Sequence, residues 1–201
     1  MRLDLLAIER WIAPRSRVLD LGCGDGVLLQ RLRHSCAVRG LGVEIDAENI
    51  TRCVAAGLSV IEQDIDQGLG NFSDQSFDTV LLTQTLQAVR RPDYVLQEML
   101  RVGKECIITF PNFGHWRARL SLLFQGKMPV SKFMPYHWYD TPNIHFCTVD
   151  DFEALCRAQG IRILRRHFEA DVEGGASWLS PLGKLWPNLF ASQAVYHVTR
   201  A

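Results

Sequence analysis

The sequence lacks any apolar run of about 18 residues, the length that a membrane-spanning helix needs. In the opening segment MRLDLLAIERWI, Asp4 and Glu9 interrupt the apolar pattern, so no signal peptide is expected there. An excess of charge is also missing, because Lys+Arg and Asp+Glu both number 22, whereas nucleic-acid-binding proteins usually carry a basic face. We therefore expect a cytoplasmic protein that binds neither membrane nor nucleic acid.

Paired cysteine motifs are missing as well. The six cysteines form no CxxC pair, and no Cys/His cluster has the spacing of a zinc site. We expect reduced thiols that serve mostly as small core residues, and no metal site.

Three catalytic signatures are absent from the chain. There is no GxSxG nucleophile elbow, which argues against a serine acyltransferase. There is neither an NPPY-type motif nor a Pro-Cys pair, and both absences argue against a DNA methyltransferase.

The 201 residues are sufficient for one domain with a full core, and we expect a single domain over 1–201. Short strand candidates alternate with helical patterns, and the strands are continuous apolar runs such as TVLLT and CIITF. Such runs are typical of parallel strands covered on both faces, so the pattern predicts a doubly wound α/β fold. The expected strands are Arg17–Leu21, Arg39–Ile45, Ser59–Gln63, Phe77–Thr83, Glu105–Phe110, Ile161–Phe168 and Ala194–Thr199.

An insert over 111–147 interrupts this rhythm. The stretch from Phe110 to Cys147 holds nine of the nineteen aromatic residues, with one helix expected from His115 to Phe124. This composition is typical of a protein–protein contact surface, but it also suits a lid over a pocket. Groups that could act on a substrate are His115, Tyr136, His137, Tyr139 and His145. For His115 and His137 the alternative is that they are hydrogen-bonded lid or interface residues.

The segment VLDLGCGDG, residues 18–26, carries the strongest functional signal. A buried strand leads into a turn with Gly22, Gly24 and Gly26, where the absence of Cβ atoms allows a ligand to approach the backbone. The dinucleotide fingerprint GxGxxG would need glycine where Val27 stands. Asp20 would repel a pyrophosphate and attract a cation, so the pattern favours S-adenosylmethionine, with a dinucleotide as the alternative.

Acidic residues at the next two strand ends extend this pattern. Glu44 is placed to accept hydrogen bonds from ribose hydroxyls, and Asp64 from an adenine amino group. For either residue, capping of the following helix is the structural alternative. The residues expected to contact S-adenosylmethionine or S-adenosylhomocysteine are Asp20, Gly22, Gly24, Gly26, Glu44, Ile45, Asp64, Ile65, Thr83 and Gln84.

From about Ser16 to Arg101 the chain resembles the class I S-adenosylmethionine-dependent methyltransferases, through VLDLGCGDG, GVEID, IEQDID and FDTVLLTQTLQAV. Over most of its length it is similar to the MetW family of methionine biosynthesis proteins. That closer likeness is carried by LGCGDGVLL, GVEID, QTLQAV, PNFGHWRARL and PYHWYDTPNIHF.

The resemblance implies a seven-stranded sheet of order 3-2-1-4-5-7-6 with an antiparallel seventh strand. It also implies a partner, homoserine O-acyltransferase, whose activity the chain would support. The rival hypothesis is a conventional methyltransferase that acts on a small molecule beneath the aromatic insert, with His115, Tyr136 and His137 as candidate catalytic residues.

Overall fold

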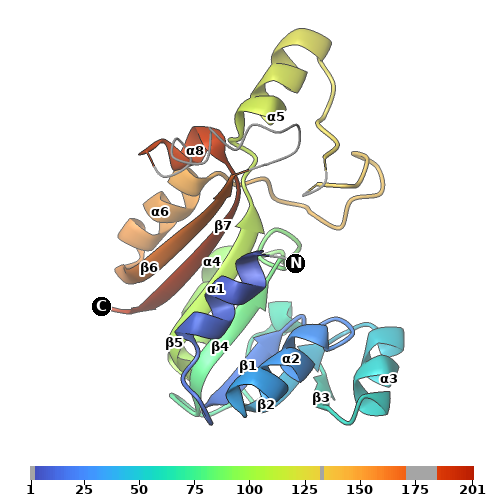
Figure 1. Ribbon diagram of the computed structural model, residues 1–201, viewed down its shortest axis with the longest axis vertical. Coiled ribbons are helices and arrows are strands. Elements are labelled where there is room, and N and C mark those ends of the chain that lie inside the picture. The colour runs from blue at the N-terminus through green and yellow to red at the C-terminus, as the bar shows by residue number, and fades with distance from the viewer. Residues whose placement is uncertain (1–2, 132–133, 171–184) are drawn as a thin grey trace.

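The computed structural model describes residues 3–131, 134–170 and 185–201. Its strands form one seven-stranded sheet of order β3-β2-β1-β4-β5-β7-β6 (Figure 1). The strands are β1 (Arg17–Leu21), β2 (Arg39–Glu44), β3 (Ser59–Glu62), β4 (Phe77–Thr83), β5 (Gly103–Pro111), β6 (Ile161–Ala170) and β7 (Ala191–Arg200). Strand β7 is antiparallel to β5 and to β6, and the other neighbours are parallel. The predicted α/β fold and its strand order are therefore confirmed.

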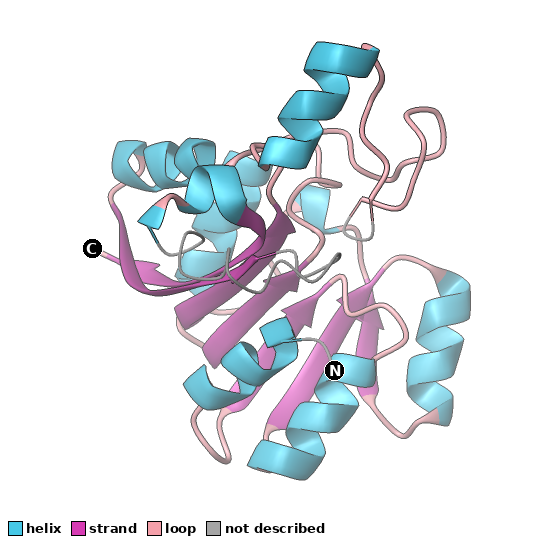
Figure 2. Ribbon diagram, turned by 45° about the horizontal axis from the view of Figure 1, so that its top comes forward, coloured by secondary structure: helices cyan, strands magenta, loops and turns pink. Residues whose placement is uncertain are grey.

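Helices cover both faces of the sheet (Figure 2). The longer ones are α1 (Leu3–Trp11), α2 (Val27–Cys36), α3 (Ala47–Ala55), α4 (Pro92–Val102) and α6 (Val149–Ala158). On one face, Val18 of β1 packs in a core with Ile8 of α1 and Leu29 of α2. Its neighbour Leu19 packs in the opposite core with side chains of α4 and α6. Successive strand residues point to opposite faces, so two apolar cores require the continuous apolar strands seen in the sequence.

The insert stands above the ends of β4 and β5, at the carboxyl edge of the sheet (Figure 1). The helix expected over His115–Phe124 is present, but it has two parts. The first is α5 (Trp116–Leu120), and the second is η2 (Ser121–Gln125), a π-helical turn that ends at Gly126, where φ is 63°. The rest of the described insert is turns and irregular chain.

The cysteines of the structure are free thiols. Cys23 and Cys53 lie with their Sγ atoms 4.0 Å apart, and burial raises the pKa of both thiols. Both are therefore neutral core residues at physiological pH. Over the described ranges, no helix has the length and apolar character needed to cross a membrane.

Candidate functional site

A cavity of about 550 Å³ opens at the carboxyl edge of the sheet, beside the glycine turn. Three carboxylates and one arginine line it, namely Glu44, Asp64, Asp66 and Arg90. The rest of its lining is Gly22, Val43, Ile45, Gln63, Ile65, Thr85, Ala88, Val89, Pro142 and Ile144. We call this space the cofactor cavity. Its lining favours a ligand with positive charge.

All three glycines of the turn adopt positive φ, at 67°, 56° and 79°, which side chains with a Cβ rarely do. They differ in what surrounds them. A Cβ at Gly22 would lie 2.8 Å from Thr85 Oγ1, and one at Gly26 would collide with Leu58 and Cys53. No atom of the described residues lies within 4 Å of the position that a Cβ on Gly24 would take. The backbone at Gly24 therefore faces open space, while Gly26 is required for packing.

Glu44 ties the end of β2 to the glycine turn. Its carboxylate accepts hydrogen bonds from the backbone N–H of Gly24 at 2.8 Å, of Ile45 at 2.8 Å and of Asp46 at 3.0 Å. A carboxylate has about four acceptor positions, so one is left for a ligand hydroxyl. Capping of α3 falls to Asp46, which accepts from Asn49, so Glu44 is not the cap of that helix.

Asp64 caps the short helical turn that follows β3. Its side chain caps η1 (Ile65–Gln67) by accepting from the backbone N–H of Asp66 at 3.0 Å. It also lines the cofactor cavity, as do Ile45 and Ile65. Capping and ligand contact are compatible, because the cap uses one carboxylate oxygen, and the other, which accepts from Gln67 Nε2 at 3.4 Å, has a second acceptor position.

Asp20 lies beneath the turn and is fully buried. Among the described residues, neither of its carboxylate oxygens has a hydrogen-bond partner. Burial, together with the negative charge of Glu44, raises the pKa of Asp20 to about 7. Asp20 is not part of the cavity lining, so its influence on a ligand there would be through space.

At the end of β4, the residue that lines the cofactor cavity is not one of the two expected from the sequence. Thr83 ends the strand, and Gln84 turns at a φ of 58° and donates its N–H to the Thr109 carbonyl at 3.0 Å. The next residue, Thr85, lines the cofactor cavity, whereas Thr83 and Gln84 are not part of that lining. Sequence reasoning also missed Pro142 and Ile144, which reach the cavity from the insert.

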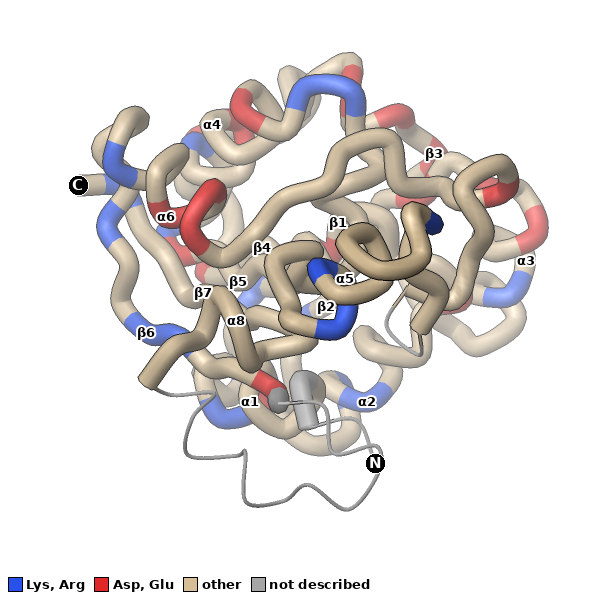
Figure 3. The backbone as a smooth tube through the Cα atoms, turned by 90° about the horizontal axis from the view of Figure 1, so that it is seen from above, with Lys and Arg blue, Asp and Glu red and all other residues tan. Residues whose placement is uncertain are grey.

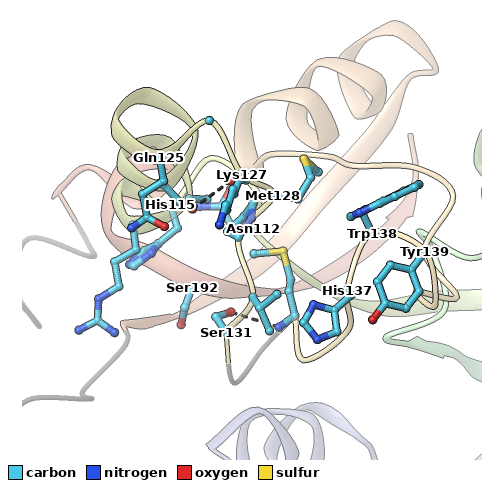
Figure 4. Close-up of a pocket in the computed structure, with 17 residues that line it drawn as sticks. Asn112, His115, Gln125, Lys127, Met128, Ser131, His137, Trp138, Tyr139 and Ser192 are labelled. Carbon is cyan, nitrogen blue, oxygen red and sulfur yellow. Dashed lines mark hydrogen bonds between the residues drawn. The ribbon is translucent and has the colours of Figure 1, made fainter.

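The candidate catalytic residues of the insert lie elsewhere. His115, His137 and Tyr139 line a second cavity of about 880 Å³, which we call the insert cavity (Figure 4). Tyr136 lines a smaller cavity next to it, and His145 Nε2 lies 3.2 Å from the Arg90 carbonyl. None of these five described side chains lines the cofactor cavity.

The sheet order, the glycine turn and the acidic strand ends define a class I S-adenosylmethionine methyltransferase fold. Solved structures agree at the level of the fold. A methyltransferase from Archaeoglobus fulgidus superposes with a TM-score of 0.69 at 17% identity, over 98% of this chain and 93% of the other. The [4+2]-cyclase SpnF superposes with a TM-score of 0.68 at 20% identity, over 99% and 80%. The fold by itself therefore does not decide which reaction, if any, takes place.

This chain belongs to the MetW family, since the family model for methionine biosynthesis protein MetW matches residues 2–198. A relative from Rhodopirellula baltica, the bifunctional methionine biosynthesis protein MetXA/MetW, is 38% identical over 97% of this chain. The chain spans 32% of that relative's length. The resemblance read from the sequence motifs is thus confirmed.

Proposed function

We propose that the chain binds S-adenosylmethionine in the cofactor cavity and associates with homoserine O-acyltransferase, whose activity it supports. The observation that carries the partnership is the relative that joins MetXA and MetW in one polypeptide. We infer that its MetXA portion is the acyltransferase implied by the sequence resemblance. Fusion of two chains holds them at high local concentration, which is useful when they act together.

The cofactor cavity fits this cofactor on two grounds. Its three carboxylates and the unpartnered Asp20 favour the ammonium and sulfonium charges of S-adenosylmethionine and oppose a dinucleotide pyrophosphate. Open space in front of Gly24 leaves room for a ligand against the backbone. When bound, the cofactor carries a methyl group on a sulfonium; Glu44, Asp64 and Gly24 would hold and orient it.

The partnership is tested with the full chain and the homoserine O-acyltransferase of the same organism. We expect the two to co-purify and the acylation rate to rise when the chain is added, measured with and without S-adenosylmethionine. No complex, and an acylation rate that is unchanged over a wide range of chain concentration, would contradict the proposal. Transfer of labelled methyl to a metabolite in the absence of the acyltransferase would support the rival hypothesis instead.

Cofactor binding is tested by Gly24→Ala. The new methyl group enters the open space that the ligand would use, and the positive φ strains an alanine. We expect the dissociation constant for S-adenosylmethionine to rise roughly 30-fold, with a loss of about 1 kcal/mol in stability. Isothermal titration calorimetry measures the first quantity and urea unfolding the second.

Gly57→Ala is the matched control. Gly57 has a φ of 68° and also has no described atom within 4 Å of its Cβ position, but it lies between α3 and the start of β3, at the edge of the sheet opposite the glycine turn and the cofactor cavity. Gly57→Ala should lower the free energy of unfolding by a similar amount and change the dissociation constant for S-adenosylmethionine by less than twofold. Equal affinities of the two variants would show that the ligand does not approach Gly24.

A further inference from the structure

Exposed apolar side chains are concentrated in the insert. Of the seventeen large hydrophobic residues exposed in the described structure, eleven lie between Leu120 and Phe146. Phe124, Trp138 and Tyr139 are 77%, 75% and 69% exposed. Large exposed apolar patches on a protein surface often mark a site that binds another molecule.

The insert cavity lies among these residues, between α5, η2 and the chain that follows Gly126 (Figure 4). Asn112, His115 and Ser192 contribute buried polar groups to it. The rings of His137 and Tyr139 stack at 5.4 Å and form part of its wall. Its ionic groups are cationic, because Arg117 and Lys127 line it and no Asp or Glu is found among its described lining.

The two cavities therefore have opposite charge and share no described lining residue. S-adenosylmethionine suits the acidic cavity, whereas the cationic lining of the insert cavity favours a group of negative charge. The exposed aromatic residues Trp138 and Tyr139 border the insert cavity and not the cofactor cavity. This placement favours a docking surface over a lid that closes on the cofactor.

Charge and composition of the insert indicate what it binds. Over 111–147 the sequence has no Glu and only one Asp, Asp140, against Arg117, Arg119, Lys127 and Lys132. The arginines on α5 can be followed as blue segments near the centre of Figure 3. Aromatic residues, Met and Arg in such density are typical of the energetic centre of a protein–protein interface.

We propose that the insert cavity and its exposed aromatic border dock the acyltransferase, and that they receive an acidic segment of that partner bearing an apolar side chain. This inference rests on the proposed function. The fused relative is matched over 97% of this chain, so it retains most or all of the insert. Attraction between opposite charges and burial of an aromatic side chain would both strengthen binding of the acyltransferase, and only the first depends on salt concentration.

The test measures the dissociation constant of the full chain for the acyltransferase by biolayer interferometry, at low and at high NaCl. Lys127→Glu should raise the constant about tenfold at low salt and much less at high salt, because salt screens the lost attraction. Trp138→Ser should raise it about tenfold at both salt concentrations. Unchanged affinity for S-adenosylmethionine would show that both variants are folded.

Two variants outside the insert serve as controls. Arg39→Glu makes the same change in charge at an exposed residue that begins β2, and Val54→Ser removes an apolar side chain that is 62% exposed on α3. Both should bind the acyltransferase within twofold of the unaltered chain. If Lys127→Glu and Trp138→Ser also bind normally, the docking surface lies elsewhere, although the partnership itself stands. If the unaltered chain does not bind, both the partnership and this inference fail.

Discussion

Replacing Asn112 with alanine should lower the free energy of unfolding by about 3 kcal/mol. Asn112 is fully buried at the start of the insert. Its amide donates to the carbonyls of Ala191 at 2.7 Å and Asn188 at 3.1 Å, and its oxygen accepts from Gly114 at 3.0 Å and Val149 at 3.3 Å. The substitution removes this partner from these four backbone groups, and from the Pro187 carbonyl at 3.4 Å, and each group left unpaired in the interior is costly.

Asn49→Ala is the control for this variant. In the described part of the chain the Asn49 side chain makes no hydrogen bond, and alanine favours the helix α3 in which it lies. Urea unfolding should therefore show a change of less than about 0.5 kcal/mol. A loss below about 1 kcal/mol for Asn112→Ala would mean that water or a relaxed backbone replaces the lost bonds.

The hydrogen bonds of Asn112 also hold one end of the insert in place. Asn112 holds the beginning of the insert to the start of α6 and to the junction before β7. Gln87 holds the far end, because its carbonyl accepts from Ile144 and His145 and its amide donates to the Pro111 carbonyl. The insert is thus fixed at both ends to the sheet edge, which positions its exposed side chains.

The sheet and the acidic strand ends could be predicted because each depends on a short stretch of sequence. Continuous apolar runs identified the strands, and five of them, β1, β2, β3, β4 and β6, begin at the predicted residue. Parallel strands bring their carboxyl ends to one edge, so Glu44 and Asp64 could be placed together without knowledge of the loops.

Contacts made across the chain could not be predicted in this way. Pro142 and Ile144 reach the cofactor cavity from a segment with no helical or strand period, so no pattern indicates where they fold back. The hydrogen bonds of Asn112 could not be predicted either, because its partners Asn188 and Ala191 are more than seventy residues away in the sequence. Separation of the two cavities also depends on the path of the insert.

Asp20 should make the protein less stable as pH rises. Its pKa is 3.8 when unfolded and about 7 when folded, because burial without a hydrogen-bond partner disfavours the charged form. The unfolded chain thus releases this proton more readily, and stability due to Asp20 is complete below pH 4 and is lost as pH rises to about 7. A shift of roughly three pKa units corresponds to about 4 kcal/mol.

Asp20→Asn removes this dependence, since asparagine does not titrate. Any packing penalty of the amide is the same at every pH, so the informative quantity is the difference in unfolding free energy between variant and unaltered chain. That difference should move in favour of Asp20→Asn by about 4 kcal/mol between pH 4 and pH 8. Urea unfolding at a series of pH values measures it.

Asp78→Asn gives the opposite sign and so controls for general effects of pH. The backbone N–H of Arg17 and the ammonium group of Lys104 hold the pKa of Asp78 below its usual value. Its contribution to stability is complete above about pH 4 and is lost in acid, so this variant should fall behind the unaltered chain as pH rises towards 4 and change little relative to it between pH 4 and pH 8. If Asp20→Asn moves in the same direction as Asp78→Asn, the buried carboxyl is stabilised by a partner. If the directions are opposite, Asp20 holds an unpaired charge at pH 8.

A cationic ligand in the neighbouring cavity would offset that charge, and S-adenosylmethionine should then protect the unaltered chain more strongly at pH 8 than it protects Asp20→Asn.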